Sequence, residues 1–194
     1  MLNAQKFSHR LLEEVLTPTA IAIDATAGNG HDTLFLARRV HQGHVYAFDV
    51  QAQAIGQTRE RLARHAPAVS VTLIHDSHAR LACHVAADVP VRAAIFNLGY
   101  LPGSDKSITT QGDSTLCAIG QIQARLVPGG RIALVAYHGH AGGAQELAQL
   151  QGFLAALDQQ SWQVMQYQFI NQQNHPPVCF CVEKLADQRY QKQA

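Results

Sequence analysis

The alternation of apolar runs with helical patterns is the feature that most constrains the fold of this chain. Five runs are mostly apolar, at residues 20–25, 44–50, 69–75, 92–98 and 131–138. Strands of this kind are typical of a parallel sheet that is covered on both faces. Between the runs lie segments with helical spacing of apolar residues, near 31–41, 51–65, 78–86, 113–126 and 143–158. This order predicts an α/β fold with a doubly wound sheet and right-handed crossovers.

The C-terminal part of the chain departs from the alternation. Residues 162–171 and 177–184 are two more strand-like runs, and the short segment between them leaves no room for a helix. Such close spacing predicts an antiparallel hairpin at one edge of the sheet. We therefore expect one domain, residues 1–194, with a mostly parallel seven-stranded sheet that resembles the Rossmann-like class I methyltransferases. A dinucleotide-binding dehydrogenase would usually continue with further βα units.

Composition limits the partners and the setting of the protein. Charged residues make up 15% of the chain and the net charge is +1, so any RNA contact must use a local patch. The low charge also fits a surface that is partly covered by a second subunit. The four cysteines form no CxxC pair, and the amphipathic start of the chain differs from a secretion signal. We expect a cytoplasmic protein without a membrane span or a metal.

A glycine-containing loop follows the first apolar run and opens the first helical segment. Gly28 and Gly30 allow positive φ and close approach of the backbone to a ligand. The dehydrogenase fingerprint is incomplete, because its third glycine would fall at Thr33. Asp24 at the strand end suits the cationic methionine end of S-adenosylmethionine and would repel a pyrophosphate; the alternative is an ordinary βα turn. The cofactor residues expected here are Asp24, Thr26, Gly28, Asn29, Gly30, His31, Asp32 and Thr33.

Two further strand ends should face the same crevice. Asp49, followed closely by Gln51, ends the second strand, where an acid binds ribose hydroxyls. Asp49 fits either nucleoside cofactor, and its alternative is a solvated turn residue. Asp76, Ser77 and His78 follow the third strand, where they can contact the adenine. Equally, Asp76 or Ser77 can simply cap the next helix.

The loop after the fourth strand should face the methyl donor. Asn97-Leu98-Gly99-Tyr100 resembles the [DN]PPY loop of amino-group methyltransferases, with Leu98 and Gly99 in place of the two prolines. In that loop the amide oxygen, here that of Asn97, accepts a hydrogen bond from an amine, and the ring of Tyr100 stacks on a flat substrate. The alternative is a polar loop with a half-buried tyrosine.

Two histidines follow the fifth strand among three glycines. Histidine titrates near neutrality, so His138 or His140 is a candidate general base; the alternative is a helix-entry turn with exposed histidines. The expected catalytic residues are Asn97, Tyr100, His138 and His140, and Asn97 is also expected to contact the cofactor. The residues expected to contact the substrate are Tyr100, Pro102, Gly103, Asp105, Lys106 and Tyr137.

Taken together, these segments resemble a bacterial family labelled "putative rRNA methylase" and associated with methylation of the aminomethyl group on the tRNA wobble uridine. The resemblance is carried by DATAGNGHDTLFLA (24–37), YAFDVQAQAI (46–55), FNLGYLPGSDKSITT (96–110), PGG (128–130), YHGHAGG (137–143) and YQFINQQNHPP (167–177). It implies an S-adenosylmethionine-dependent enzyme that forms 5-methylaminomethyl-2-thiouridine. It also implies a homodimer that binds the tRNA anticodon stem-loop.

Other interpretations stay open. The methyl acceptor can instead be rRNA, a small molecule or a protein amine. A non-catalytic nucleoside- or RNA-binding module is disfavoured by the loops on the substrate side, and a nicotinamide-dependent oxidoreductase by Asp24 and Thr33. For phosphate contacts, Lys106 in the substrate loop is the first candidate, and the others are Arg10, Arg38, Arg39, Arg59, Arg61 and Arg64. For the arginines of 59–64 the alternative is a solvated helix face.

Overall fold

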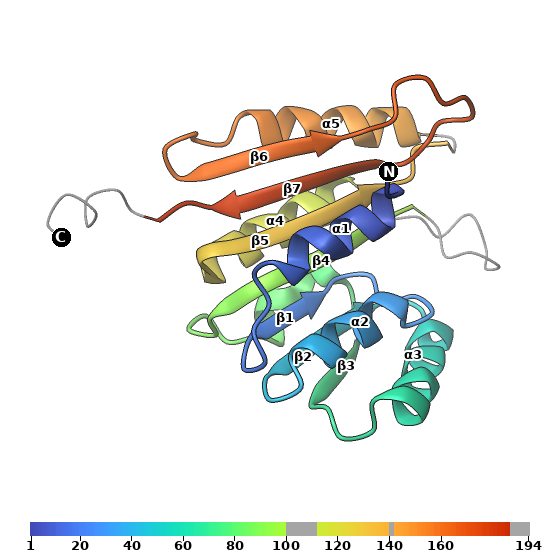
Figure 1. Cartoon of the computed structure of the whole chain (residues 1–194), viewed down its shortest axis with the longest axis vertical. Coiled ribbons are helices and arrows are strands. Elements are labelled where there is room, and N and C mark those ends of the chain that lie inside the picture. The colour runs from blue at the N-terminus through green and yellow to red at the C-terminus, as the bar shows by residue number, and fades with distance from the viewer. Residues whose placement is uncertain (100–111, 140–141, 187–194) are drawn as a thin grey trace, which may run out of the picture.

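The computed structural model describes residues 1–99, 112–139 and 142–186, which include a seven-stranded sheet in the order β3-β2-β1-β4-β5-β7-β6 (Figure 1). The strands are β1 (Ile21–Asp24), β2 (His44–Asp49), β3 (Val71–His75), β4 (Val91–Leu98), β5 (Leu126–Ala136), β6 (Trp162–Tyr167) and β7 (Val178–Lys184). The first five pair in parallel, whereas β7 runs antiparallel to both β5 and β6. The prediction of a mostly parallel sheet with a C-terminal antiparallel hairpin is confirmed.

Helices cover both faces of the sheet. We call one side the front face, because α1 (Ala4–Glu13), α2 (His31–Arg39) and α3 (Ala52–His65) lie before the sheet in Figure 1. The other side is the back face, formed by α4 (Gly112–Arg125), α5 (Gly143–Ala155) and the 3₁₀ helix η1 (His78–Cys83). Each face has its own buried apolar cluster.

The apolar runs in the sequence have a direct explanation in the central strand β4. Ala93 and Ile95 join the front cluster, whereas Ala94 and Phe96 join the back cluster, and all four are fully buried. Successive side chains of a strand point to opposite faces, so a strand that is covered on both sides needs apolar residues at every position.

Several element boundaries differ from the sequence prediction. The helix predicted over 78–86 is a 3₁₀ helix that ends at Cys83, with Arg80 at φ −99° and ψ 21°, outside the helical region. The strand predicted over 131–138 begins at Leu126, because residues 127–130 form a bulge in which Gly129 has φ 72°. The strand predicted over 162–171 ends at Tyr167.

The amphipathic start of the chain is the helix α1, which is fastened to the C-terminal hairpin. Nε of Arg131 donates to Glu183 at 2.7 Å, and its Nη1 donates to Glu14 and to the carbonyl oxygen of Leu11, both at 2.8 Å. The rings of Phe7 and Tyr167 stack with centroids 4.1 Å apart. These contacts fix where α1 lies over the sheet. None of the helices in the described part of the chain is long and apolar enough to cross a membrane.

Candidate active site

The loop between β1 and α2 is shaped by two glycines at the carboxyl edge of the sheet. Gly28 and Gly30 have φ of 53° and 76°. A Cβ atom at Gly30 would lie 2.8 Å from the Cα of Thr58, so both the backbone angle and the space require glycine there. Gly30 is the N-cap of α2 and supplies no side-chain hydrogen bond to it. The first N–H groups of α2 therefore suit an anionic group such as a ligand carboxylate.

Asp24 is fully buried at the end of β1, and it fastens this loop. Its Oδ1 accepts from the backbone N–H of Thr26 at 3.1 Å, and its Oδ2 accepts from the hydroxyl of Thr33 at 2.6 Å. Burial, together with the nearby charge of Asp32, raises the pKa of Asp24 from 3.8 to about 7. Direct contact of Asp24 with the methionine amino group stays a prediction, because both of its oxygens already accept hydrogen bonds within the protein.

Asp49 joins the ends of β1 and β2. Its Oδ2 accepts from the N–H of Gly28 at 2.8 Å, and its Oδ1 accepts from the N–H of Gln51 at 2.9 Å. Each carboxylate oxygen can accept a second hydrogen bond. Asp49 is partly exposed, so it can still receive the two hydroxyls of a ribose. Both residues predicted for this strand end thus lie at the edge, with Gln51 as the N-cap of α3.

The loop after β3 is more structural than the sequence indicates. Ser77 caps η1 by accepting from the N–H of Ala79 at 3.2 Å, and Asp76 accepts from the N–H of Ser77 at 2.8 Å. His78 is only 7% exposed, and its Nδ1 lies 2.9 Å from the carbonyl oxygen of Ala25. Burial lowers the pKa of His78, which favours the neutral ring. The capping alternative therefore holds for Ser77, and adenine contacts from this loop stay predictions.

Asn97 lies at the end of β4 and is held at two points. Its backbone N–H donates to the hydroxyl of Thr26 at 2.7 Å, and its Nδ2 donates to Asp32 on α2. Its Oδ1 is buried and has no hydrogen-bond partner among the described residues. An unpaired buried acceptor costs about 1–3 kcal/mol, so this atom needs a reason to remain as it is. In the described part of the site, this unpaired oxygen is the strongest indication that a bound ligand donates a hydrogen bond to Asn97.

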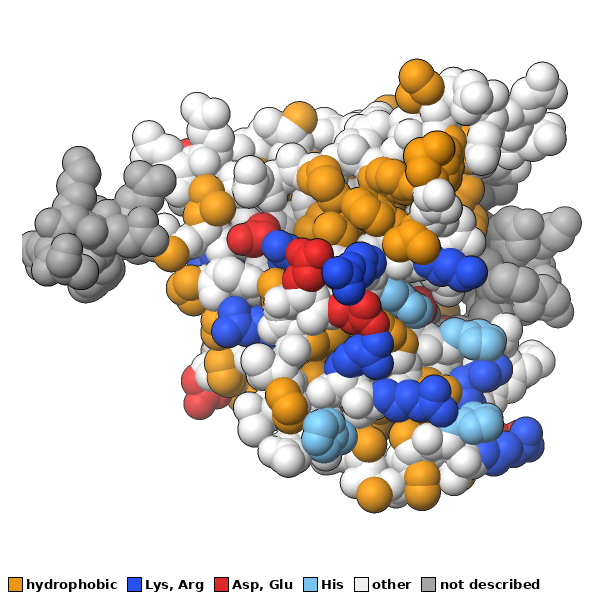
Figure 2. Space-filling model, viewed as in Figure 1, with side chains coloured by type: hydrophobic (Ala, Val, Ile, Leu, Met, Phe, Trp, Pro, Cys, Tyr) orange, Lys and Arg blue, Asp and Glu red, His pale blue; other side chains and the backbone are white. Residues whose placement is uncertain are grey.

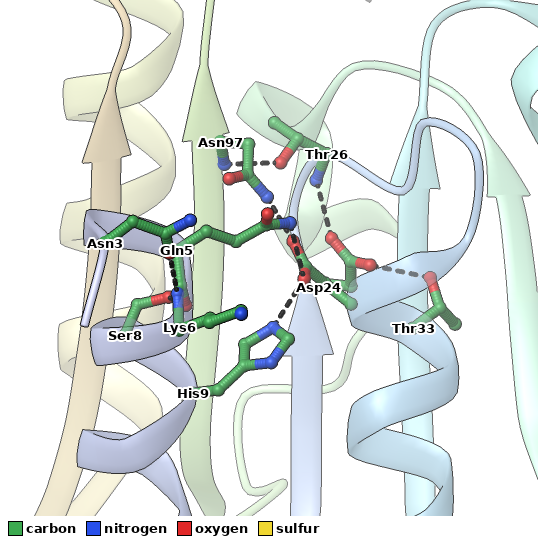
Figure 3. A network of polar contacts seen from close by, with 10 residues as sticks. Asn3, Gln5, Lys6, Ser8, His9, Asp24, Thr26, Thr33 and Asn97 are labelled. Carbon is green, nitrogen blue, oxygen red and sulfur yellow. Dashed lines mark hydrogen bonds and ion pairs between the residues drawn. The ribbon is translucent and has the colours of Figure 1, made fainter. Parts of the chain in front are cut away.

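The helix α1 brings to the edge two residues that the sequence pattern does not identify. Nε2 of His9 lies 2.6 Å from Oδ1 of Asp32, and Nε2 of Gln5 lies 3.5 Å from the same oxygen. Figure 3 shows His9 and Gln5 reaching from α1 toward the end of β1. Asp32 is only 4% exposed. The amphipathic pattern of α1 is the only signal that the sequence holds, and it does not say which strand end the helix approaches.

The loop after β5 places Tyr137 and His138 at the same edge. Tyr137 is 40% exposed, and burial of its hydroxyl together with the charge of Asp32 raises its pKa. Nε2 of His138 lies 3.1 Å from the carbonyl oxygen of Pro176, and its ring meets that of His175 at 5.6 Å. The hairpin loop therefore packs against the loop after β5. Since a carbonyl only accepts, Nε2 carries a proton, and Nδ1 is the basic nitrogen of a neutral His138 ring.

A small hollow of about 20 Å³, lined in part by these two residues, lies between the back-face helices. Its walls include Leu98 at the end of β4, Thr115 and Leu116 on α4, and Leu147 on α5. Its lining is mostly apolar, and Tyr137 and His138 border it at the carboxyl edge of the sheet.

Several predicted residues lie outside the described residues: Tyr100, Pro102, Gly103, Asp105, Lys106 and His140. Their roles stay predictions. Within residues 1–99, 112–139 and 142–186, no three His, Cys, Asp or Glu side chains gather closely enough to hold a metal ion.

The geometry fits the cofactor that the sequence predicts. The uncapped start of α2 can receive the methionine carboxylate, and Asp49 can receive the ribose hydroxyls. Asn97 at the end of β4 and Tyr137 just after β5 lie at the same edge of the sheet. Fold and site together define a class I methyltransferase.

Comparison with known proteins gives the family. The chain matches the family model described as "Putative rRNA methylase" over residues 45–183, more than half of its length, and it belongs to that family. A chloroplastic tRNA (mnm(5)s(2)U34)-methyltransferase of Arabidopsis thaliana is 36% identical over 191 residues, covering 94% of this chain and 70% of that protein. The family predicted from the sequence is thus confirmed.

Solved structures agree. A protein of Clostridium thermocellum described as a putative rRNA methylase superposes with a TM-score of 0.92 at 39% identity, over 95% of this chain and 99% of that one. A putative methyltransferase of Streptococcus mutans in complex with SAH gives a TM-score of 0.88 at 45% identity, again over 95% and 99% of the two chains.

Proposed function

We propose that this protein transfers the methyl group of S-adenosylmethionine to the aminomethyl group of a modified tRNA wobble uridine, forming 5-methylaminomethyl-2-thiouridine. The observation that carries the proposal is the buried Oδ1 of Asn97, which has no hydrogen-bond partner among the described residues and which an N–H of the amine would satisfy. The name of the Arabidopsis relative, a tRNA (mnm(5)s(2)U34)-methyltransferase, supports the choice of amine.

The chemical problem of this reaction is the proton on the amine. A primary amine that titrates like lysine has a pKa of ~10.4, and freeing its lone pair at pH 7 costs roughly 4.6 kcal/mol. When bound, S-adenosylmethionine supplies an electrophilic methyl group on its sulfonium. The apolar walls beside Leu98 and Leu116 lower the cost, because burial disfavours the ammonium form.

Two side chains then act on the amine. Asn97 Oδ1 accepts one N–H of the amine and directs its lone pair at the methyl carbon, so that the N–C bond forms as the sulfonium C–S bond breaks and the thioether leaves. The neutral His138 ring takes up the proton at Nδ1, while its Nε2 stays bonded to the carbonyl oxygen of Pro176. Alignment of two bound reactants can contribute ~7–11 kcal/mol, so no covalent intermediate is needed.

We also propose that the front face binds the RNA backbone. The helices α1, α2 and α3 carry seven cations, and apart from the buried Asp32 their acids are Glu13 and Glu60. The cations are Lys6, Arg10, Arg38, Arg39, Arg59, Arg61 and Arg64. Figure 2 shows Lys, Arg and His side chains spread over this face. A local field of this kind attracts phosphates although the net charge is only +1.

A homodimer is proposed on separate grounds. The edge strand β6 exposes Val164 and Met165, and Ile170 in the hairpin loop is 94% exposed. A second copy that covers this apolar edge would also explain the low share of charged residues. Light scattering tests the proposal, and a mass equal to one chain would contradict it.

We further propose a cytoplasmic setting, which is supported by four cysteines that are all free thiols.

The decisive experiment for the reaction is transfer of labelled methyl from S-adenosylmethionine to tRNA that carries 5-aminomethyl-2-thiouridine, followed by nucleoside analysis. Label in the methylaminomethyl nucleoside is expected. Binding of the cofactor without transfer to this tRNA would refute the proposed acceptor, and label in rRNA offered in parallel would point to the alternative.

A further inference from the structure

We infer that His9 and Asp32 are positioning residues that fix the amide of Asn97, so that the N-terminal helix α1 completes the active site. The inference rests on the proposed function for the identity of the amine, but its geometric basis is independent of the substrate. Nothing in the sequence pattern assigns a role to His9.

The first step concerns the orientation of the amide. A side-chain amide can flip and so exchange the positions of its oxygen and its nitrogen. An ionised carboxylate only accepts hydrogen bonds, so it favours the orientation that places the amide nitrogen beside it. Nδ2 of Asn97 meets Oδ2 of Asp32. Asp32 thereby selects one of the two orientations, in which the buried Oδ1 is left to face a donor.

The second step concerns what holds Asp32. Its carboxylate is almost fully buried beside Asp24, another acid, so it needs donors of its own. Besides Asn97, the nearer donor is Nε2 of His9 at 2.6 Å from Oδ1, whereas Nε2 of Gln5 lies farther away, at 3.5 Å. Figure 3 shows the approach of His9 from α1 and of Asn97 from the neighbouring strand.

The third step concerns the rigidity of His9 itself. Its ring lies against Phe35 on α2, with centroids 3.9 Å apart and planes within 6°. The helix that carries it is clamped by Arg131 and by the stack of Phe7 on Tyr167. His9 on α1, Asp32 and Asn97 therefore form a series of contacts in which each side chain is held in place.

The test compares three variants. His9→Phe keeps a ring on Phe35 and removes the donor to Asp32, and His9→Gln restores a donor. The matched control is His44→Phe at the amino end of β2, which also loses ring hydrogen bonds, to Ser70 and Thr72, but at the opposite edge of the sheet. We expect His9→Phe to lower kcat about 10- to 100-fold with KM for tRNA nearly unchanged, as for a small misplacement of a reacting group. His9→Gln should recover most of kcat, and His44→Phe should match the wild type.

A second measurement does not depend on the substrate. With ¹⁵N-asparagine labelling, the Asn97 side-chain amide is assigned by its loss in Asn97→Asp, among five asparagines in the chain. Its proton shifts should move in His9→Phe, return in His9→Gln and stay fixed in His44→Phe. If the amide signals of Asn97 do not move in His9→Phe, the inference is overturned, even where kcat falls. Moved signals in a protein whose wild type fails to methylate the tRNA would refute the substrate and leave the positioning intact.

Discussion

The two faces of the sheet differ in what their helices offer to solvent. The front face carries seven Lys and Arg side chains on α1, α2 and α3, whereas the back-face helices carry Arg80 and Arg125 against Asp113 and Glu146. The back face instead has the larger buried cluster, with Leu81, Ile119, Ile122 and Leu150 among its members. A net charge near zero thus conceals an uneven distribution of charge, with most of the helical cations on the front face.

The largest expected effect concerns the back face. Ile122 on α4 is fully buried in the back cluster, and Ile122→Ala should lower the free energy of unfolding by about 2–5 kcal/mol. The affinity of the folded protein for tRNA should not change, because α4 contributes nothing to the front face. Urea unfolding and a binding titration give the two quantities. A matched loss of affinity would break the division between the faces.

The next prediction concerns the pH dependence of stability, which Asp24 controls from the carboxyl edge of the sheet. The pKa of Asp24 is raised from 3.8 to about 7, so the folded protein holds this proton more tightly than the unfolded chain. The stability that this brings is complete below about pH 4 and is lost as the pH rises through 7. Asp24→Asn should therefore gain stability relative to the wild type over this range, by roughly 4 kcal/mol at most. Unfolding measured from pH 4 to 8 tests this, and a constant difference would contradict it.

A third prediction concerns the methyl acceptor. Asn97→Ala removes both the oxygen that receives the amine and the hydrogen bond to Asp32, and kcat/KM should fall about 100-fold, or ~2.7 kcal/mol. Binding of S-adenosylmethionine, measured by calorimetry, should stay within a few-fold of wild type. Wild-type turnover in this variant would remove Asn97 from the mechanism.

The smallest effect is on the front face. Arg10→Gln combined with Arg38→Gln should weaken tRNA binding and lower the slope of log K against log salt by about 0.7–0.9 for each phosphate that is no longer neutralised. Arg92→Gln removes one positive charge at the amino end of β4 and should leave the slope unchanged. An equal slope in all three proteins would show that the cations of the front face are only solvated.

The sequence predicts the sheet well, because strands buried on both faces leave long apolar runs, as in 92–98, and because the hairpin lacks a helix. It also predicts the strand ends that carry Asp24, Asp49 and Asn97, since the carboxyl ends of parallel strands meet at one edge. It does not predict His9, which reaches Asp32 only through the docking of α1 on the far hairpin. Nor does it show that Asp24 and His78 form their hydrogen bonds inside the protein, because periodicity carries no information on side-chain partners.

The clamp on α1 has a consequence for the order of folding. The helix that begins at Ala4 is held by Arg131 on β5, which also binds Glu183 on β7, and the hydroxyl of Tyr167 donates to the carbonyl oxygen of Leu2 at 2.7 Å. The helix α1 therefore finds its complete docking site only after β7 has been synthesised, more than 160 residues later in the chain. Contacts across so much of the chain are slow to form. We therefore expect the active edge to be completed late in folding, after β7 has joined the sheet and α1 has docked beside it.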